Sequence, residues 1–340
     1  MSIDLRPWLV DVPRAAADRI AAGRRVLVAS HENPDADTLG AAIGIATIVE
    51  RHGGEAQLLC ADPVPPIYGF LSGVERFRTD PDQGIEPDLL VVCDCGALDR
   101  LGDLGVRHAD LFGRLPRVIV DHHASNTDGG PGDWIDPAAA ATCELVTLLA
   151  TALDVPLDAA DGAMAAALMA GVVMDTATFA HPNATPRTLA VSAALVEAGA
   201  PLAEISRRLY RSKPDAQLRL LGRALHRLQT AGSGRIVWSE LRASDHDETG
   251  SLPSHSEGII DLLSQSETAD VAILFKEADP ETTRISVRTR TGGLDATRLT
   301  GAFGGGGHAR AAGATVQAPL AVAEARVLAE AERLLDAPPA

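Results

Sequence analysis

The sequence predicts an α/β protein in two parts, the larger of which has a mostly parallel sheet with helices on both faces. Two observations lead to this prediction. In the first half of the chain, short β-branched segments alternate with alanine-rich helical segments, as in sheets whose strands are buried on both faces. Beyond about residue 230, strands return in a second series, which predicts a smaller C-terminal α/β domain.

The elements of the first part are expected where apolar runs meet residues that end them. Strands are expected at 26–30, 55–61, 88–94 and 117–121. A helix is expected from Thr38 to His52, because Gly53 and Gly54 follow it and glycine commonly ends a helix. Two more helical segments are expected near 138–153 and 160–174.

A helical connector is expected to lead into the second part. Residues 185–229 have helical patterns that Pro186, Pro201 and Pro214 interrupt. We therefore predict three regions: an N-terminal domain, a connector with its hinge at 209–217, and a C-terminal domain, over 1–194, 195–230 and 231–340 respectively. The last domain is expected to have strands at 236–241, 271–277 and 284–290, and helices near 255–266 and 319–335.

Composition excludes several classes of protein. With 46% hydrophobic residues among 340, the chain can bury a sizeable core and is not disordered. Its 30 basic and 46 acidic residues give a net charge of −16, which argues against binding to duplex DNA or to anionic membranes. No apolar run reaches the roughly 18 residues of a membrane span, and the first residues lack the apolar core of a secretory signal. Four cysteines make no disulfide framework, so we expect a cytoplasmic protein.

The segment HENPDADTLG, from His31 to Gly40, places one imidazole and two carboxylates directly after a strand. Ligands of open α/β sheets gather at the carboxyl ends of the strands, so His31, Asp35 and Asp37 are expected to converge on one crevice. This set of donors suits a divalent ion such as manganese, magnesium or zinc. The alternative is structural: Asp37 caps the helix and His31 is an ordinary loop residue.

Asp94, in the segment VVCDCG, follows another apolar strand. A carboxylate buried there needs a partner or a metal ion; the alternative is a solvated aspartate at a strand end. Cys93 and Cys95 flank it and form a C-x-C pattern. On an extended strand both cysteines point away from the face that Asp94 uses, so we interpret them as core residues.

The segment VIVDHHAS ends a strand with Asp121, His122 and His123. Successive residues of a strand point to opposite sides, so one histidine can bind metal while the other reaches a substrate, and Asp121 can orient a ligating imidazole. Asp175, in AGVVMDTATF, ends an apolar helical run. Together the four segments offer too many ligands for one tetrahedral ion and suit two ions that share a carboxylate.

The C-terminal domain combines a glycine run with a local excess of arginine. In FGGGGHARAAG, four consecutive glycines precede His308, and their backbone amides can approach an anion closely. Residues 284–310 contain five arginines and a single aspartate, so the local charge is +4. Arg288 and Arg290 are expected to share a strand face that can grip a phosphate. The alternative is a flexible loop beside a solvated basic strand.

In this order, HENPDAD, VVCDCG, DHH and GVVMDT resemble the four motifs of the DHH phosphoesterase family. SVRTR and GGGGHARAAG resemble the DHH-associated substrate-binding domain of that family. Over roughly residues 20–335 the chain is similar to the bacterial subgroup of bifunctional oligoribonucleases and 3′-phosphoadenosine 5′-phosphate (PAP) phosphatases, also called nanoRNases. The resemblance implies hydrolysis of short RNA, of PAP, and of linear or cyclic dinucleotides such as c-di-AMP. It also implies that the C-terminal domain presents the substrate across a cleft.

The resemblance implies two divalent ions, Mn²⁺ in first place with Mg²⁺ or Co²⁺ as alternatives. The residues implied to hold them are His31, Asp35, Asp37, Asp94, His122 and Asp175. In this assignment Asp94 bridges the ions, with His31 and Asp35 on one side. His123 would contact the scissile phosphate and protonate the leaving group. The residues implied to bind the substrate are Arg288, Arg290, His308 and the glycines Gly305, Gly306 and Gly307.

Two other functions are left open by the sequence. A manganese inorganic pyrophosphatase shares the N-terminal motifs, but it needs a lysine-rich anion site. This chain has only Lys213 and Lys276, both outside residues 284–310. A non-catalytic nucleotide-binding regulator is expected to lose candidate ligands, whereas all are present here. The expected partners are therefore short RNA or nucleotides and neither duplex DNA nor membranes, with a homodimer as one option.

Overall fold

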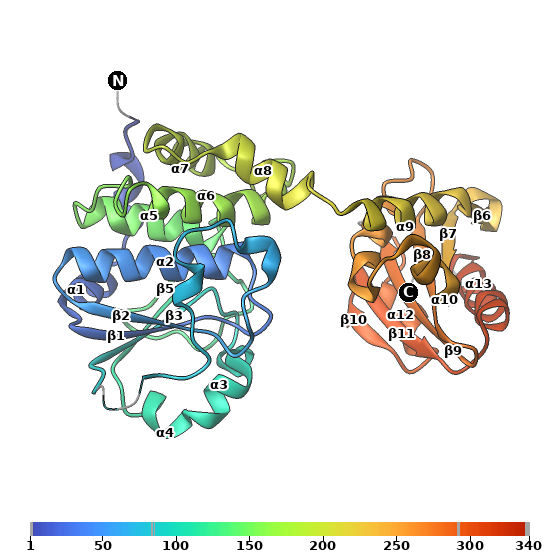
Figure 1. Cartoon of the computed structure of the whole chain (residues 1–340), viewed down its shortest axis with the longest axis horizontal. Helices are drawn as coiled ribbons and strands as arrows, with labels where there is room; N and C mark the ends of the chain where they lie inside the picture. Colours follow the sequence, from blue (N-terminus) through green and yellow to red (C-terminus); the bar gives the residue numbers. More distant parts are fainter. Residues whose placement is uncertain (1–2, 83, 85, 291–292, 337–340) are drawn as a thin grey trace. The chain divides into compact units, whose positions relative to one another are not determined.

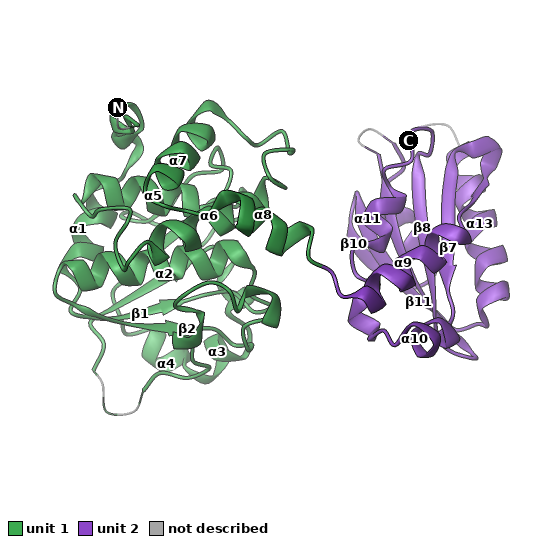
Figure 2. Ribbon diagram, turned by 45° about the horizontal axis from the view of Figure 1, so that its top comes forward, with its two compact units in different colours: residues 1–212 green, residues 213–340 purple. Residues whose placement is uncertain are grey.

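The computed structural model describes residues 3–82, 84, 86–290 and 293–336 and divides into two compact units, residues 1–212 and 213–340 (Figures 1 and 2). Each unit has its own sheet with helices packed on it. The α/β architecture in two parts is therefore confirmed.

The sheet of the first unit has five parallel strands in the order β2-β1-β3-β4-β5. They are β1 (Arg25–Ala29), β2 (Glu55–Leu59), β3 (Leu89–Cys93), β4 (Arg117–Asp121) and the short β5 (Trp134–Ile135). The first four lie where the sequence predicts strands. Because the strands are parallel, the segments that follow β1, β3 and β4 emerge side by side at one edge of the sheet.

Helices cover both faces of this sheet (Figure 1). On one face lie α1 (Arg14–Ala22), α2 (Ala36–Arg51), α5 (Thr142–Ala152) and α6 (Ala163–Asp175), with α7 (Pro186–Glu197) and α8 (Leu202–Tyr210) outside them. On the other face lie the short helices α3 (Gly102–Arg107) and α4 (Ala109–Phe112). Val26 and Val28 of β1 point into the first core, and Leu27 and Ala29 into the second. A continuous apolar strand thus serves two cores.

No single helix among the described residues is both long and apolar enough to cross a membrane. The pair α7 and α8, bent by 112° at the break between them, reaches the required length and composition only when both helices are counted together.

The sheet of the second unit has six strands in the order β10-β11-β9-β8-β7-β6, antiparallel except for the pair β7 and β8. They are β6 (Gln229–Ala231), β7 (Ile236–Leu241), β8 (Val271–Asp279), β9 (Thr282–Thr289), β10 (Gly306–His308) and β11 (Ala311–Val316). The strands expected at 236–241, 271–277 and 284–290 correspond to β7, β8 and β9; the other three were not predicted.

Two separate cores flank the second sheet. On one face, α9 (Asp215–His226) and α11 (Ile259–Leu263) contribute buried residues, and α10 (Ala243–Thr249) packs beside α9. On the other face lie α12 (Ala296–Gly301) and α13 (Leu320–Asp336). The register of β8 and β9 decides which side chains face which core.

The boundary between the units falls after Ser212, within the stretch 209–217 expected to be the hinge. The residues expected to form one connector, 195–230, are divided between the units. Leu209 of α8 is buried in the core of the first unit, whereas Leu220 and Ala224 of α9 are buried in the second. Proline interrupts these helices where expected, but their apolar faces attach them to different cores.

Candidate functional site

Three neighbouring strands of the first sheet carry candidate donors just beyond their carboxyl ends. His31 follows β1, Asp94 follows β3 and His122 follows β4. His31 Nε2 lies 3.6 Å from Asp94 Oδ2, and His122 Nε2 lies 3.6 Å from Asp94 Oδ1. Asp94 therefore has an imidazole next to each of its oxygens.

The candidate donors form three overlapping groups of three. In each group the three donor atoms lie within 4.8 Å of one another; the groups are His31, Asp35 and Asp94, then Asp37, His122 and Asp175, and then Asp94, His122 and His123. His122 Nε2 lies 3.2 Å from Asp175 Oδ2 and 4.0 Å from Asp37 Oδ2. All six residues expected to hold ions are thus brought together, although Asp175 comes from the end of a helix and not of a strand.

The start of α2 gives its two aspartates different tasks. Asp35 is the N-cap, and its Oδ1 accepts the backbone N–H groups of Asp37 and Thr38 at 2.9 and 3.1 Å. The structural alternative, in which Asp37 caps the helix, is therefore wrong, because the cap is Asp35. Asp37 is fully buried, and its oxygens accept the N–H groups of Thr142 and Cys143 at 2.6 and 2.9 Å. These two residues begin α5, so the positive end of that helix dipole holds the Asp37 carboxylate.

Asp94 occupies an unusual backbone conformation. Its φ is 54°, in the left-handed region that few residues other than glycine adopt. Its Oδ1 accepts the hydroxyl hydrogen of Thr142 at 2.9 Å. The turn also breaks the alternation of the strand, so Cys93 is buried in the core on the α2 side and Cys95 in the core on the α3 side. Both are core residues as predicted, but they do not share a face.

Asp121 orients His123 and not His122. It is fully buried, and its two oxygens accept hydrogens from His123 Nδ1 and from Asn126 Nδ2, both at 2.7 Å. His122 has a different neighbour, since its Nδ1 lies 3.4 Å from the carbonyl oxygen of Ala139. The imidazole that Asp121 orients is therefore that of His123, which lies with Asp94 and His122 in one of the candidate donor groups; that Asp121 orients a metal ligand stays a prediction. With Nδ1 engaged, His123 has only Nε2 left for a further partner.

Burial and crowding shift the pKa values of the carboxyl groups. Burial raises the pKa of Asp35 to about 6, and the charges of Asp94 and Asp175 add to this rise. The pKa of Asp37 also rises well above its usual value, first through burial and then through Asp94 and Asp175. Burial would also raise the pKa of Asp94. The hydrogen bond and charge of His31 and the charge of His122 outweigh burial, so the pKa of Asp94 is lowered. Carboxylates held together against their repulsion are stabilised by divalent cations, and the mixed oxygen and nitrogen donors fit such ions.

Three residues near these donors were not predicted. Thr142 and Asn126 hold Asp94 and Asp121, and Tyr210 supports the helix end that carries Asp175. The Tyr210 hydroxyl donates to the carbonyl oxygen of Met174 at 2.8 Å. Asn126 stands shortly after DHH in the sequence, which is a usable signal. No local pattern could connect Tyr210 to a partner 36 residues away.

In the second unit, the two arginines expected to act jointly have different partners. Arg288 of β9 pairs with Asp261 of α11, with Nε and Oδ1 2.8 Å apart. Arg290 lies just beyond β9 and donates to the carbonyl oxygens of Ser266, at 2.8 Å, and of Glu267. Arg290 therefore holds the loop after α11, in contrast to the joint phosphate grip expected of the two residues.

The glycine run forms an edge strand and not a flexible loop. Gly306–His308 is β10, which pairs with β11. A Cβ atom on Gly305 would lie 2.2 Å from the carbonyl oxygen of Gly313, and one on Gly307 would lie 2.6 Å from that of Ala311. These two glycines are required by the close approach of the neighbouring strand. A Cβ atom on Gly306 would meet nothing within 4 Å, so the space next to Gly306 is open. His308, two residues later, is exposed.

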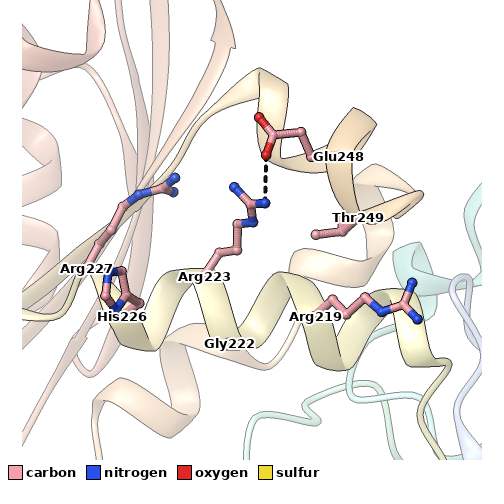
Figure 3. A pocket seen from close by; sticks show the side chains of 7 residues that line it. All are labelled: Arg219, Gly222, Arg223, His226, Arg227, Glu248 and Thr249. Atoms are coloured by element: carbon pink, nitrogen blue, oxygen red, sulfur yellow. Dashed lines mark ion pairs between the residues drawn. The ribbon is translucent and has the colours of Figure 1, made fainter.

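A groove of about 430 Å³ between α9 and α10 is lined by none of these residues (Figure 3). Arg219, Arg223 and Arg227 line it. Arg223 pairs with Glu248 at 2.6 Å, and Arg227 pairs with Asp245. Asp245, whose side chain is fully buried, contacts both Arg223 and Arg227. Because an incoming anion cannot easily displace a buried carboxylate, the groove is a poorer anion site than its composition indicates.

Comparison with known proteins places these features in one family. Residues 25–174 match the model of the DHH family, N-terminal domain, and residues 247–335 match that of the DHHA1 domain. A bifunctional oligoribonuclease and PAP phosphatase NrnA from Thermus thermophilus is 31% identical over 292 residues, which are 86% of this chain and 84% of the relative. The chain belongs to the DHH phosphoesterase family.

A second relative and a solved structure are similar to this chain over most of its length. A bifunctional oligoribonuclease and PAP phosphatase NrnA from Bacillus subtilis is 24% identical over 86% of this chain and 89% of its own length. The crystal structure of an exopolyphosphatase-related protein from Bacteroides fragilis has the same fold, with a TM-score of 0.80 and 20% identity over 95% of this chain and 98% of that chain. The resemblance predicted from the four motifs is confirmed.

Proposed function

We propose that this DHH-family protein is a metal-dependent phosphoesterase that hydrolyses short RNA oligonucleotides and PAP. The observation that carries the proposal is the pair of three-donor groups that approach each other at Asp94. The relatives from Thermus thermophilus and Bacillus subtilis, both named as oligoribonucleases and PAP phosphatases, support it. Linear and cyclic dinucleotides such as c-di-AMP present the same type of ester and belong to the proposed substrates.

Two divalent cations are proposed for the two donor groups, Mn²⁺ in first place and Mg²⁺ or Co²⁺ as alternatives. His31 and Asp35 would hold one and Asp37, His122 and Asp175 the other, with Asp94 shared. When bound, such cations activate a water molecule and neutralise charge on the phosphoryl oxygens. The protein contributes rigidity, because Thr142 fixes one oxygen of Asp94 and the start of α5 fixes both oxygens of Asp37.

His123 is proposed to protonate the leaving oxygen. Hydrolysis forms a bond from a water oxygen to phosphorus and breaks the bond from phosphorus to the leaving oxygen, which must then take up a proton. Asp121 accepts the hydrogen on His123 Nδ1, so the proton to be donated is the one on Nε2. The hydrogen bond to Asp121, with further charge from Asp94, raises the pKa of His123 although burial opposes the rise. The imidazole therefore keeps this proton to a higher pH than a free histidine does.

The second unit is proposed to bind the nucleotide part of the substrate. Arg288, His308 and the open side of Gly306 are the proposed contacts, while Gly305, Gly307 and Arg290 shape the surrounding backbone. The side chains of the Arg288–Asp261 pair are 30% and 56% exposed. Ion pairs this exposed contribute little, so a substrate phosphate can replace the carboxylate of Asp261.

A cytoplasmic location is also proposed. All four cysteines of the chain are free and buried, as is common in proteins of reducing compartments.

The test is a panel of substrates assayed with Mn²⁺, Mg²⁺ or Co²⁺: RNA of two to ten nucleotides, PAP, linear and cyclic diadenylate, and pyrophosphate. We expect mononucleotides from RNA and inorganic phosphate from PAP, and neither in the presence of a chelator. Asp94→Asn should reduce both activities to background, whereas Asp103→Asn, which changes an exposed residue of α3, is the matched control and should leave them unchanged. Preference for pyrophosphate, or nucleotide binding without any hydrolysis, would refute the proposal.

A further inference from the structure

Three side chains of β9 face away from the core that α12 and α13 cover. Ile285 and Val287 lie in that core. Because side chains alternate along a strand, Arg284, Ser286 and Arg288 point to the opposite face of the sheet. On this face α11 covers only part of β8 and β9, and Arg284 remains exposed.

The register of the sheet brings a lysine to this face. Lys276 of β8 is paired with Arg284, although it lies outside the arginine-rich segment of the sequence. On its other side Arg284 is paired with Thr315 of β11. Lys276 and Arg284 thus form a cation pair across two strands, in a chain that has 30 basic residues against 46 acidic ones.

This cation pair has no counter-ion in the described part of the chain. Neither Lys276 nor Arg284 has a carboxylate oxygen within the 4.0 Å of an ion pair, whereas Arg288 on the same face is paired with Asp261. Burial and the charges of Arg284 and Arg288 lower the pKa of Lys276, and the charge of Glu257 offsets this only in part. Like charges placed opposite each other on neighbouring strands destabilise a sheet, so this pair has a cost that an anionic ligand would remove.

Small residues separate the cation pair from Arg288 and His308. Ser286, Gly313 and Gly306 are paired across three strands and form a row. This row lies between the cation pair on one side and Arg288 and His308 on the other. No side chain of this row extends beyond a hydroxymethyl group, and Gly306 is open on its outer side. The row therefore leaves space for a ligand that contacts both flanks.

We propose that Lys276 and Arg284 form a second anion subsite, which binds a phosphate group other than the one hydrolysed. The subsite rests on the proposed function, because it makes nucleotides with two phosphate groups the preferred substrates. Arg284 and Arg288 are four residues apart on one strand, about 13 Å at 3.3 Å per residue. That separation suits two anionic groups of one ligand better than a single phosphate. Both a 5′-phosphorylated dinucleotide and a nucleoside bisphosphate have this chemistry.

The test compares the binding of ligands that differ by one phosphate group. It uses the wild-type protein, variants that lack one positive charge, and one variant that keeps it. The ligand pairs are pApA with ApA and PAP with AMP. The variants are Arg284→Gln, Lys276→Met and, to test rescue, Arg284→Lys. Arg298→Gln is the matched control, because Arg298 is exposed on α12, at the opposite face of the sheet. Dissociation constants are measured by calorimetry on the Mn²⁺-loaded protein with hydrolysis-resistant phosphonate analogues of the dinucleotides, and kcat/KM with the natural ones.

Wild-type protein should prefer the doubly phosphorylated ligand of at least one pair. Arg284→Gln and Lys276→Met should each reduce that preference about 10- to 100-fold, the value of a charge-assisted hydrogen bond. Arg284→Lys should retain most of it, and Arg298→Gln all of it. The ligand pair that loses its preference identifies the source of the second phosphate.

An equal loss of affinity for both members of each pair would overturn the subsite, since it would indicate general damage. Arg284 is exposed, so its variants test the subsite even if Lys276→Met does not fold. If the wild-type protein binds with the expected preference but hydrolyses nothing, the proposed function fails and the subsite stands. If it hydrolyses both dinucleotides with equal kcat/KM and also binds PAP no better than AMP, the subsite fails and the proposed function stands.

Discussion

Replacing Gly171 by alanine is expected to damage the candidate metal centre without removing any donor. Gly171 belongs to α6, which packs against α2. A Cβ atom there would lie 2.4 Å from Cys143 Sγ, 2.5 Å from Asp37 Oδ1 and 2.8 Å from Asp37 Cα. Because a Cα atom cannot rotate away as the end of a side chain can, either the two helices must separate or Asp37 must move.

The size of the effect follows from these contacts. Ordinary van der Waals contact begins at 3.4 Å, so the backbone of Asp37 must retreat by about 0.6 Å from its distance of 2.8 Å. Overpacking costs about 1–3 kcal/mol, and the higher helix propensity of alanine recovers about 1 kcal/mol. The free energy of unfolding should therefore fall by only about 0–2 kcal/mol. Misplacing a reacting group by about 1 Å can cost about 100-fold in rate, so activity should fall by roughly 10- to 100-fold.

Gly44→Ala is the matched control for the effect of packing alone. Gly44 lies at the same packing of helices, but a Cβ atom there would meet the side-chain ends of Val146 at 2.7 Å and Leu168 at 2.9 Å, and no donor. Urea unfolding should give similar losses for both variants, whereas calorimetric titration with Mn²⁺ should show weakened binding for Gly171→Ala only. Wild-type affinity and stoichiometry in Gly171→Ala would refute the reasoning about Asp37.

Three further predictions concern Asp121 and Asp261, which hold candidate site residues, and Glu324 of α13. Asp121→Asn should lower kcat about 10- to 100-fold with little change in KM, because Asp121 acts by orienting the proton-donating imidazole; a changed KM with an unchanged kcat would contradict that role. Asp261→Asn should lower KM for phosphorylated substrates by a factor of about 2–5, because an exposed carboxylate that competes for Arg288 is worth at most about 1 kcal/mol; an unchanged KM would argue that Arg288 binds no phosphate. Burial and the neighbouring carboxyl group of Glu240 raise the pKa of Glu324 from its usual 4.5 to about 8. Between these values the folded chain holds a proton that the unfolded chain releases, so stability falls as the pH rises through this window. Glu324→Gln should therefore raise Tm more at pH 9 than at pH 5, and equal increases would count against the assignment.

The donor residues could be predicted because one simple rule places most of them. Strands buried on both faces are unbroken apolar runs, so the charged residues that follow them are conspicuous, as Asp94 and His122 are. The parallel sheet then brings such residues to one edge. Asp175 ends a helix, where no strand pattern marks it, and by itself it is a weak candidate that gains value only as one more aspartate at the edge of a buried element.

The features that were missed depend on register and on single backbone turns. Nothing in the sequence places Lys276 opposite Arg284, because the pairing is set by the hairpin that joins β8 to β9. The left-handed turn at Asp94 separates two cysteines that an extended strand would keep on one face. The glycine run has the composition of a loop, since glycine is uncommon in strands, and only its pairing with β11 makes it β10.

The packing of the interior has a consequence for how the chain loses its structure on heating. None of the four hydrophobic clusters formed by the described residues includes side chains from both units. An all-or-none transition requires that melting one region removes the packing of the rest, and a divided interior does not impose this. The protein is therefore expected to unfold in two calorimetric steps. Mn²⁺ should move only the step of the first unit, because a ligand stabilises the cooperative block that binds it.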